Sequence, residues 1–208
     1  VGLPGLLGEV KALQSQQRFA DALLKLEEIE KAFPEAADVH LIRGSIQLAP
    51  SVRDFDAAEA SFTKAAALKP GSAAPAFSLA ELRFLKHEWK AAREKFEALL
   101  AEFPQVPLAV RHLVLFKVLI CQLKLDDVRG AEAALAAHFT FMDDTPAYYM
   151  SKAALAFQKK NETAAQEWLD KAGTIFGSKQ VSSYLDCLIE ARWVSSIGLP
   201  SVKDEEKR

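Results

Sequence analysis

The chain has 208 residues, of which 50% are hydrophobic and 26% are charged, with a net charge of −2 and two cysteines. This composition excludes collagen-like, disordered and disulfide-framework proteins, because those classes need far more glycine and proline, charge imbalance or cysteine. The nearly balanced charge also gives no electrostatic reason to expect binding to nucleic acid or to an anionic membrane surface.

Apolar residues with helical spacing predict helices that come in pairs. Pro107 and Pro146 suit the first turn of a helix, where the missing N–H costs nothing. No segment has the alternation of a strand, so we predict an all-α fold. The predicted first helices of five pairs are Leu6–Ser15, Ala37–Leu48, Ala73–His87, Pro107–Lys124 and Pro146–Lys160, and an eleventh helix is predicted at about Gln180–Ser195.

Five alanines mark a repeat along the chain. Four residues after each alanine comes an apolar side chain, and twelve residues after it comes a proline, an aspartate or a glycine, which are typical of turns and helix ends. The alanines are Ala22, Ala58, Ala92, Ala131 and Ala165, with spacings of 36, 34, 39 and 34 residues.

This pattern resembles the tetratricopeptide repeat, a helix–turn–helix unit of about 34 residues. That family places a small residue midway along the first helix, because small side chains let neighbouring helices cross closely. Gly44 in pair two and Ala153 in pair five match that position, whereas Val10 and Leu119 in pairs one and four depart from it. The resemblance covers residues 5–177 and implies an α-α superhelix of about five helix pairs with a C-terminal capping helix.

The resemblance divides the chain into a repeat domain at 1–196 and a charged C-terminal tail at 197–208. Cys121 and Cys187 each fall in an apolar helical pattern, so we interpret them as buried thiols, although a long-range disulfide is also possible. The predicted helix at 107–124 is apolar on nearly every side, which requires burial or a covering partner. An apolar stripe on the last helix predicts either capping of the repeat array or dimerisation.

The sequence offers no convincing catalytic, cofactor or metal site. The four histidines are scattered, and His87-Glu88 lacks the second histidine that a metalloprotease helix would carry at position 91. We therefore expect no enzyme activity, no cofactor and no metal.

The resemblance implies that the first helices line a concave groove that binds a protein or peptide. Its aromatic residues would suit an amphipathic helix or an extended apolar segment, but the same spacing is also that of core residues. Only one lysine and no asparagine face the groove, which disfavours a clamp for a terminal carboxylate. The projected groove residues are Leu41, Ser45, Phe77, Glu81, Phe84, Phe116, Lys117, Ile120, Met150 and Phe157.

We therefore predict a non-enzymatic protein–protein interaction scaffold. The alternative is a self-assembling subunit, a homodimer through the apolar helix at 107–124 or through the last helix. We expect a soluble protein without a membrane span, either cytoplasmic or exported with its signal peptide already removed.

Overall fold

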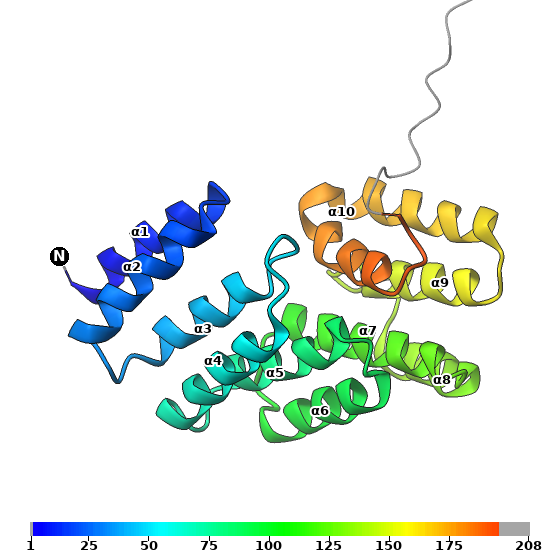
Figure 1. Cartoon of the computed structure of the whole chain (residues 1–208). Helices are drawn as coiled ribbons and strands as arrows, with labels where there is room; N and C mark the ends of the chain where they lie inside the picture. Colours follow the sequence, from blue (N-terminus) through cyan, green and yellow to red (C-terminus); the bar gives the residue numbers. More distant parts are fainter. Residues whose placement is uncertain (1, 196–208) are drawn as a thin grey trace, which may run out of the picture. The chain divides into compact units, whose positions relative to one another are not determined.

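The structure is a computed structural model that describes residues 2–195, and within that range it contains helices and turns but no strand. The all-α helical-repeat solenoid is confirmed, and the predicted charged tail at 197–208 lies outside the described residues. The helices are α1 (Leu3–Ser15), α2 (Phe19–Ala32), α3 (Ala37–Gln47), α4 (Phe55–Leu68), α5 (Ala73–Leu85), α6 (Trp89–Glu102), α7 (Leu108–Lys124), α8 (Val128–His138), α9 (Ala147–Gln158) and α10 (Glu162–Glu190) (Figure 1).

The chain forms two compact units, Val1–Glu88 with α1–α5 and Trp89–Arg208 with α6–α10. The five predicted first helices are α1, α3, α5, α7 and α9, each within three residues of the predicted bounds. In the first unit α1 packs on α2 and α3 on α4. In the second unit α7 packs on α8 and α9 on α10.

The repeat is visible in the backbone at the turn after each first helix. One residue at each turn has a positive φ of 45° to 60°, although none of these residues is glycine. This left-handed conformation ends the first helix and sets the direction of the second. The residues are Gln17, Arg53, His87, Asp126 and Lys160, whose spacings of 36, 34, 39 and 34 equal those of the alanines.

Side-chain caps begin three of the second helices. The side chains of Asp54, Asp127 and Asn161 accept hydrogen bonds of 3.0, 2.9 and 3.1 Å from the backbone N–H three residues later. Each cap satisfies a donor that the helix itself leaves unpaired, and this is the reason these polar residues stand at helix starts.

The small residues of the repeat lie at helix crossings, as the sequence predicts. All five register alanines are fully buried. Gly44 on α3 lies so close to Phe62 on α4 that a Cβ atom at position 44 would be 2.7 Å from two atoms of the ring. The first and second helices of pair two therefore approach more closely than a larger residue would allow.

α10 is broken at Gly177, whose φ of 74° and ψ of 166° are not helical. The predicted eleventh helix is therefore the second half of α10, and it ends at Glu190, before the predicted end at residue 195. We name residues 178–190 the terminal helix. Trp193 lies beyond it, after a turn at Arg192 with a φ of 61°. Cys121 and Cys187 are both buried and are not joined in a disulfide, so the disulfide alternative is wrong.

Candidate partner-binding surfaces

The first unit has a cavity of about 280 Å³ between α3 and α5. Three residues that the sequence projects onto the groove face line this cavity together, namely Ser45, Phe77 and Glu81. The remaining lining residues are Leu48, Ala49, Phe62, Ser78 and Leu85. Three of the five projected residues of α3 and α5 thus meet at one place.

The cavity has an apolar floor and a polar rim. Phe62 on α4 is only 2% exposed and forms part of the floor, and Phe77 is half-buried. Ser45 is exposed and accepts a hydrogen bond of 3.3 Å from the Gln14 side chain of α1. Such a site can hold an apolar side chain while its rim contacts polar groups of a main chain.

Two other projected residues of the first unit lie outside this cavity. Leu41 is partly buried and packs against the cluster of Ala58, Phe62 and Leu82. Phe84 is fully buried, so it is a core residue and does not line an accessible surface.

In the second unit the projected groove face is mostly inaccessible. Phe116, Ile120 and Met150 are fully buried and Lys117 is 4% exposed, whereas Phe157 is half-buried. The projection of these four buried residues onto an open groove is therefore corrected. These four side chains are covered within the chain.

The terminal helix and Trp193 contribute to this cover. The ring of Tyr184 lies 5.2 Å from that of Phe116 on α7. Trp193 stacks on Phe157 of α9 with a centroid distance of 6.4 Å, and the Lys124 ammonium lies 4.1 Å from the centre of the Trp193 ring. The C-terminal segment thus caps the helices α7 and α9 of its own unit.

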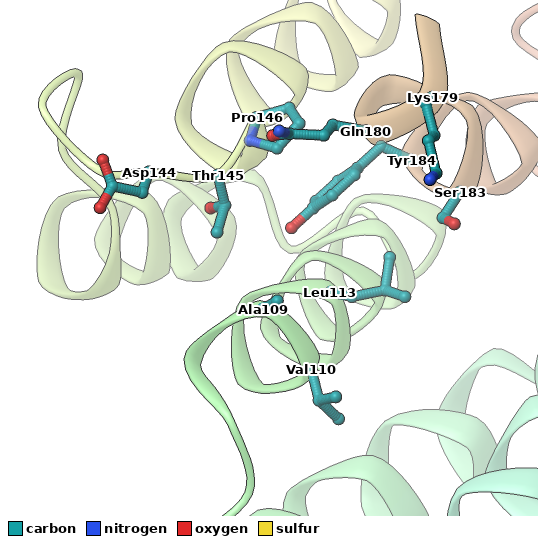
Figure 2. A pocket seen from close by; sticks show the side chains of 10 residues that line it. All are labelled: Ala109, Val110, Leu113, Asp144, Thr145, Pro146, Lys179, Gln180, Ser183 and Tyr184. Carbon is teal, nitrogen blue, oxygen red and sulfur yellow. The ribbon is translucent and has the colours of Figure 1, made fainter. Parts of the chain in front are cut away.

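A second cavity, of about 480 Å³, remains beside the terminal helix (Figure 2). It is lined from α7, from the segment before α9 and from the terminal helix, whose Tyr184 ring reaches across it toward Thr145. The lining residues are Ala109, Val110, Leu113, Asp144, Thr145, Pro146, Lys179, Gln180, Ser183 and Tyr184.

Buried polar groups lie at the edge of this second cavity. His112 Nδ1 and the Thr145 hydroxyl are 2.7 Å apart and hydrogen-bonded, and burial lowers the pKa of His112. Burial also raises the pKa of Tyr184 to about 12. The Thr145 side chain lowers the same pKa, but its effect is smaller than that of burial. The Tyr184 hydroxyl is buried, and none of the hydrogen bonds among the described residues includes it.

The sequence gives no hint of an ion-pair network in the first unit. The Glu30 carboxylate of α2 lies 2.6 Å from Lys64 Nζ of α4 and 2.7 Å from Arg43 Nη2 of α3, with His40 Nε2 at 3.6 Å. The hydrogen bond from Lys64, followed by that from Arg43, lowers the pKa of Glu30 to about 2. The network ties three helices together, so we interpret it as structural.

The described residues contain neither a cluster of metal ligands nor a helix suited to cross a membrane. No group of three or more histidine, cysteine, aspartate or glutamate side chains within residues 2–195 is arranged to hold a metal ion. No helix in the described part of the chain combines the length and hydrophobicity needed to cross a membrane.

Comparisons with known proteins agree with this architecture. The family model of the tetratricopeptide repeat matches residues 7–49 and 51–107. A tetratricopeptide repeat protein from Parabacteroides merdae is 16% identical, with a TM-score of 0.65 over 90% of this chain and 70% of the other. No curated protein matches the chain in sequence.

Two further solved structures are similar over most of both chains. TTC0263, a thermophilic tetratricopeptide repeat protein of Thermus thermophilus, is 18% identical and has a TM-score of 0.62, covering 91% of this chain and 96% of that one. PilF of Pseudomonas aeruginosa is 12% identical, with a TM-score of 0.62 over 89% and 90% of the two chains. At these identities the likeness concerns the fold alone.

Proposed function

Because this chain is a tetratricopeptide repeat protein, we propose that it is a non-enzymatic scaffold that binds an apolar peptide segment of a protein partner in the cavity of its first unit. Proteins with this fold generally act as protein–protein interaction scaffolds. The observation that carries the proposal is the meeting of Ser45, Phe77 and Glu81, projected from the repeat register, in one cavity.

The lining of the cavity defines the chemistry of recognition. A volume of about 280 Å³ has room for one or two apolar side chains, and Leu48, Phe62 and Phe77 would surround them. Burial of an apolar side chain contributes about 1.5–3 kcal/mol, so one or two anchors support a modest affinity. Hydroxyl groups of Ser45 and Ser78 at the same cavity can bond to the main chain of the bound segment.

Site-specific photocrosslinking tests this proposal. A photoreactive amino acid replaces Ser45 in one variant and the 60% exposed Leu24 on α2 in a control variant, and both are irradiated in lysate of the native organism. We expect a crosslinked partner from position 45 and not from position 24. Phe77→Asp should then weaken binding of that partner about tenfold or more, since a charge would enter the apolar floor.

Two outcomes would contradict the proposal. One is equal crosslinking from both positions, and the other is unchanged binding by a correctly folded Phe77→Asp variant. Leu24→Asp serves as the matched control for the added charge, because Leu24 is exposed in the same unit.

The two surfaces that suggested a homodimer, on α7 and on the terminal helix, are mostly buried within the chain. In α7, most of the apolar side chains, including Val114, Phe116 and Leu119, are buried within the chain. Tyr184 and Leu188 of the terminal helix are buried as well. We therefore expect a monomer in sedimentation at micromolar concentration, and a stable dimer would reopen the alternative.

A further inference from the structure

We propose that the cavity of about 480 Å³ in the second unit is a second binding site, one that takes an extended peptide with an apolar side chain between a basic and an acidic residue. The site is separate from the cavity of the first unit. It would stand even if the first cavity bound nothing.

The middle of the cavity is apolar. Ala109, Val110 and Leu113 on α7 contribute one side, and Pro146 together with the Tyr184 ring contributes another (Figure 2). Val110 is 38% exposed, although it is a large apolar residue on a helix that is otherwise mostly buried. This surface fits the apolar side chain of a bound segment.

Opposite charges stand at the two ends of the apolar middle. Asp144 lies on the Thr145 side and Lys179 on the terminal-helix side (Figure 2). Both are exposed, and neither side chain takes part in an ion pair or hydrogen bond within residues 2–195. A peptide with a basic residue near Asp144 and an acidic residue near Lys179 would complement this arrangement, and charge complementarity is what selects one partner over another.

Tyr184 forms a wall of the cavity from the terminal helix. Tyr184 is only 4% exposed, and its hydroxyl points toward the Thr145 end without a partner among the described residues (Figure 2). The Tyr184 ring therefore forms part of the apolar wall, while Gln180 and Ser183 offer polar contacts to the main chain of a bound peptide.

Binding at this site is coupled to the position of the terminal helix. Lys179, Gln180, Ser183 and Tyr184 all belong to that helix, which follows the break at Gly177. A peptide that bridges them to α7 binds only when the helix is docked, so it stabilises the docked state by mass action. Bound peptide should therefore slow hydrogen exchange of the amides at 178–190.

Short capped peptides test the charge rule independently of peptide direction. The probes are acetylated and amidated Lys-Ser-Leu-Ser-Glu, Lys-Ser-Leu-Ser-Lys, Glu-Ser-Leu-Ser-Glu and Gln-Ser-Leu-Ser-Gln, titrated at low salt and followed by NMR chemical shifts. The wild-type chain should bind the mixed-charge peptide about threefold to tenfold more tightly than the others, which is the range for two exposed ion pairs. Added salt should reduce this preference.

Single charge reversals should change the preferred peptide. Asp144→Lys makes both ends basic and should favour the diacidic peptide, and Lys179→Glu makes both ends acidic and should favour the dibasic peptide. Glu167→Lys, at an exposed position on the first half of α10, is the matched control and should keep the wild-type ranking.

Three results would overturn this proposal. They are the absence of shifts at the cavity residues, a ranking that Asp144→Lys and Lys179→Glu leave unchanged, and shifts confined to the cavity around Phe77. The last result would support the proposed function of the first unit while it removes the second site, so the two proposals fail separately.

Discussion

Replacing Gly44 with alanine should destabilise the first unit, because α3 and α4 cross at this residue. A Cβ atom at position 44 would lie 2.7 Å from Cδ1 and Cζ of Phe62. Carbon atoms in favourable contact are about 3.5–4.0 Å apart, so the ring or a helix must move by about 1 Å. Phe62 is only 2% exposed and cannot turn into solvent.

The expected size follows from two opposing effects. Overpacking of this kind costs about 1–3 kcal/mol. Alanine is the better helix former by about 1 kcal/mol, which offsets part of the cost. Because the overlap is severe, we expect Gly44→Ala to lower the free energy of unfolding by about 1–2 kcal/mol.

Gly8→Ala is the matched control for helix propensity. Gly8 lies within α1, in the same unit, and a Cβ atom there would have no neighbour within 4 Å. This variant should be more stable than the wild type by about 1 kcal/mol. The difference between the two variants therefore isolates the contact with Phe62.

Urea unfolding followed by circular dichroism measures both variants, and hydrogen exchange locates the effect in α3 and α4. If Gly44→Ala were as stable as Gly8→Ala, the close crossing would not constrain position 44 and the role assigned to the small residue would be wrong. Phe62→Leu in the Gly44→Ala background should recover part of the loss, as coupled neighbours do.

Three further predictions concern stability. Glu30→Gln should lower the free energy of unfolding at pH 7 by about 1–2 kcal/mol. Since the folded pKa of about 2 lies below the usual 4.5, the difference in stability between wild type and variant should be full above pH 4.5 and shrink as the pH falls toward 2. Denaturation at several pH values measures this difference, and its absence at pH 7 would show that the network contributes nothing. Tyr184→Phe removes a buried hydroxyl and should raise the melting temperature, with an increase of about 1 kcal/mol in the free energy of unfolding. A decrease of similar size would show that the hydroxyl is hydrogen-bonded in the folded chain. Gly177→Ala imposes backbone strain of about 1–3 kcal/mol, because residue 177 has a φ of 74°, and should therefore speed hydrogen exchange of the terminal helix. Gly173→Ala is the control and should leave this exchange unchanged, because Gly173 lies one turn earlier and a Cβ atom there would have no close neighbour.

The helix pairs could be predicted from the sequence because their signals are local. The alanine spacings of 36, 34, 39 and 34 recur in the turn residues from Gln17 to Lys160, because one helix–turn–helix geometry places both. Gly177 could also be recognised as a turn residue, since twelve residues after each register alanine the second helix is due to end. The end of the terminal helix could not, because Trp193 continues the apolar spacing beyond the last helical residue, Glu190.

The polar networks could not be predicted, because their members are distant in sequence. His112 and Thr145 are 33 residues apart, and Glu30 and Lys64 are 34 apart. Hydrophobic periodicity reports which face of a helix is buried, but it does not report which polar groups meet across a helix interface. The place of Asp144 and Lys179 at one cavity could not be predicted from the sequence for the same reason, since nothing else distinguishes them from other surface charges.

The accessibility of the groove face depends on the side chains that each unit places there. In the first unit Ser45, Ser78 and Glu81 lie among the apolar residues, so water is tolerated and a cavity stays open. In the second unit the corresponding face carries large apolar side chains such as Phe116 and Met150. Each would lose about 1.5–3 kcal/mol if it were left exposed.

The terminal helix therefore covers much of the apolar face of the second unit, and the cavity of about 480 Å³ stays open beside it. In that cavity the side chains of Asp144 and Lys179 take part in no ion pair or hydrogen bond within the described residues. The same repeat geometry thus leaves a cavity in each unit, for which we propose an apolar peptide in the first and a charge-selected peptide in the second. The difference follows from which side chains the register brings to the face, small polar ones such as Ser45 in the first unit and large apolar ones such as Phe116 in the second.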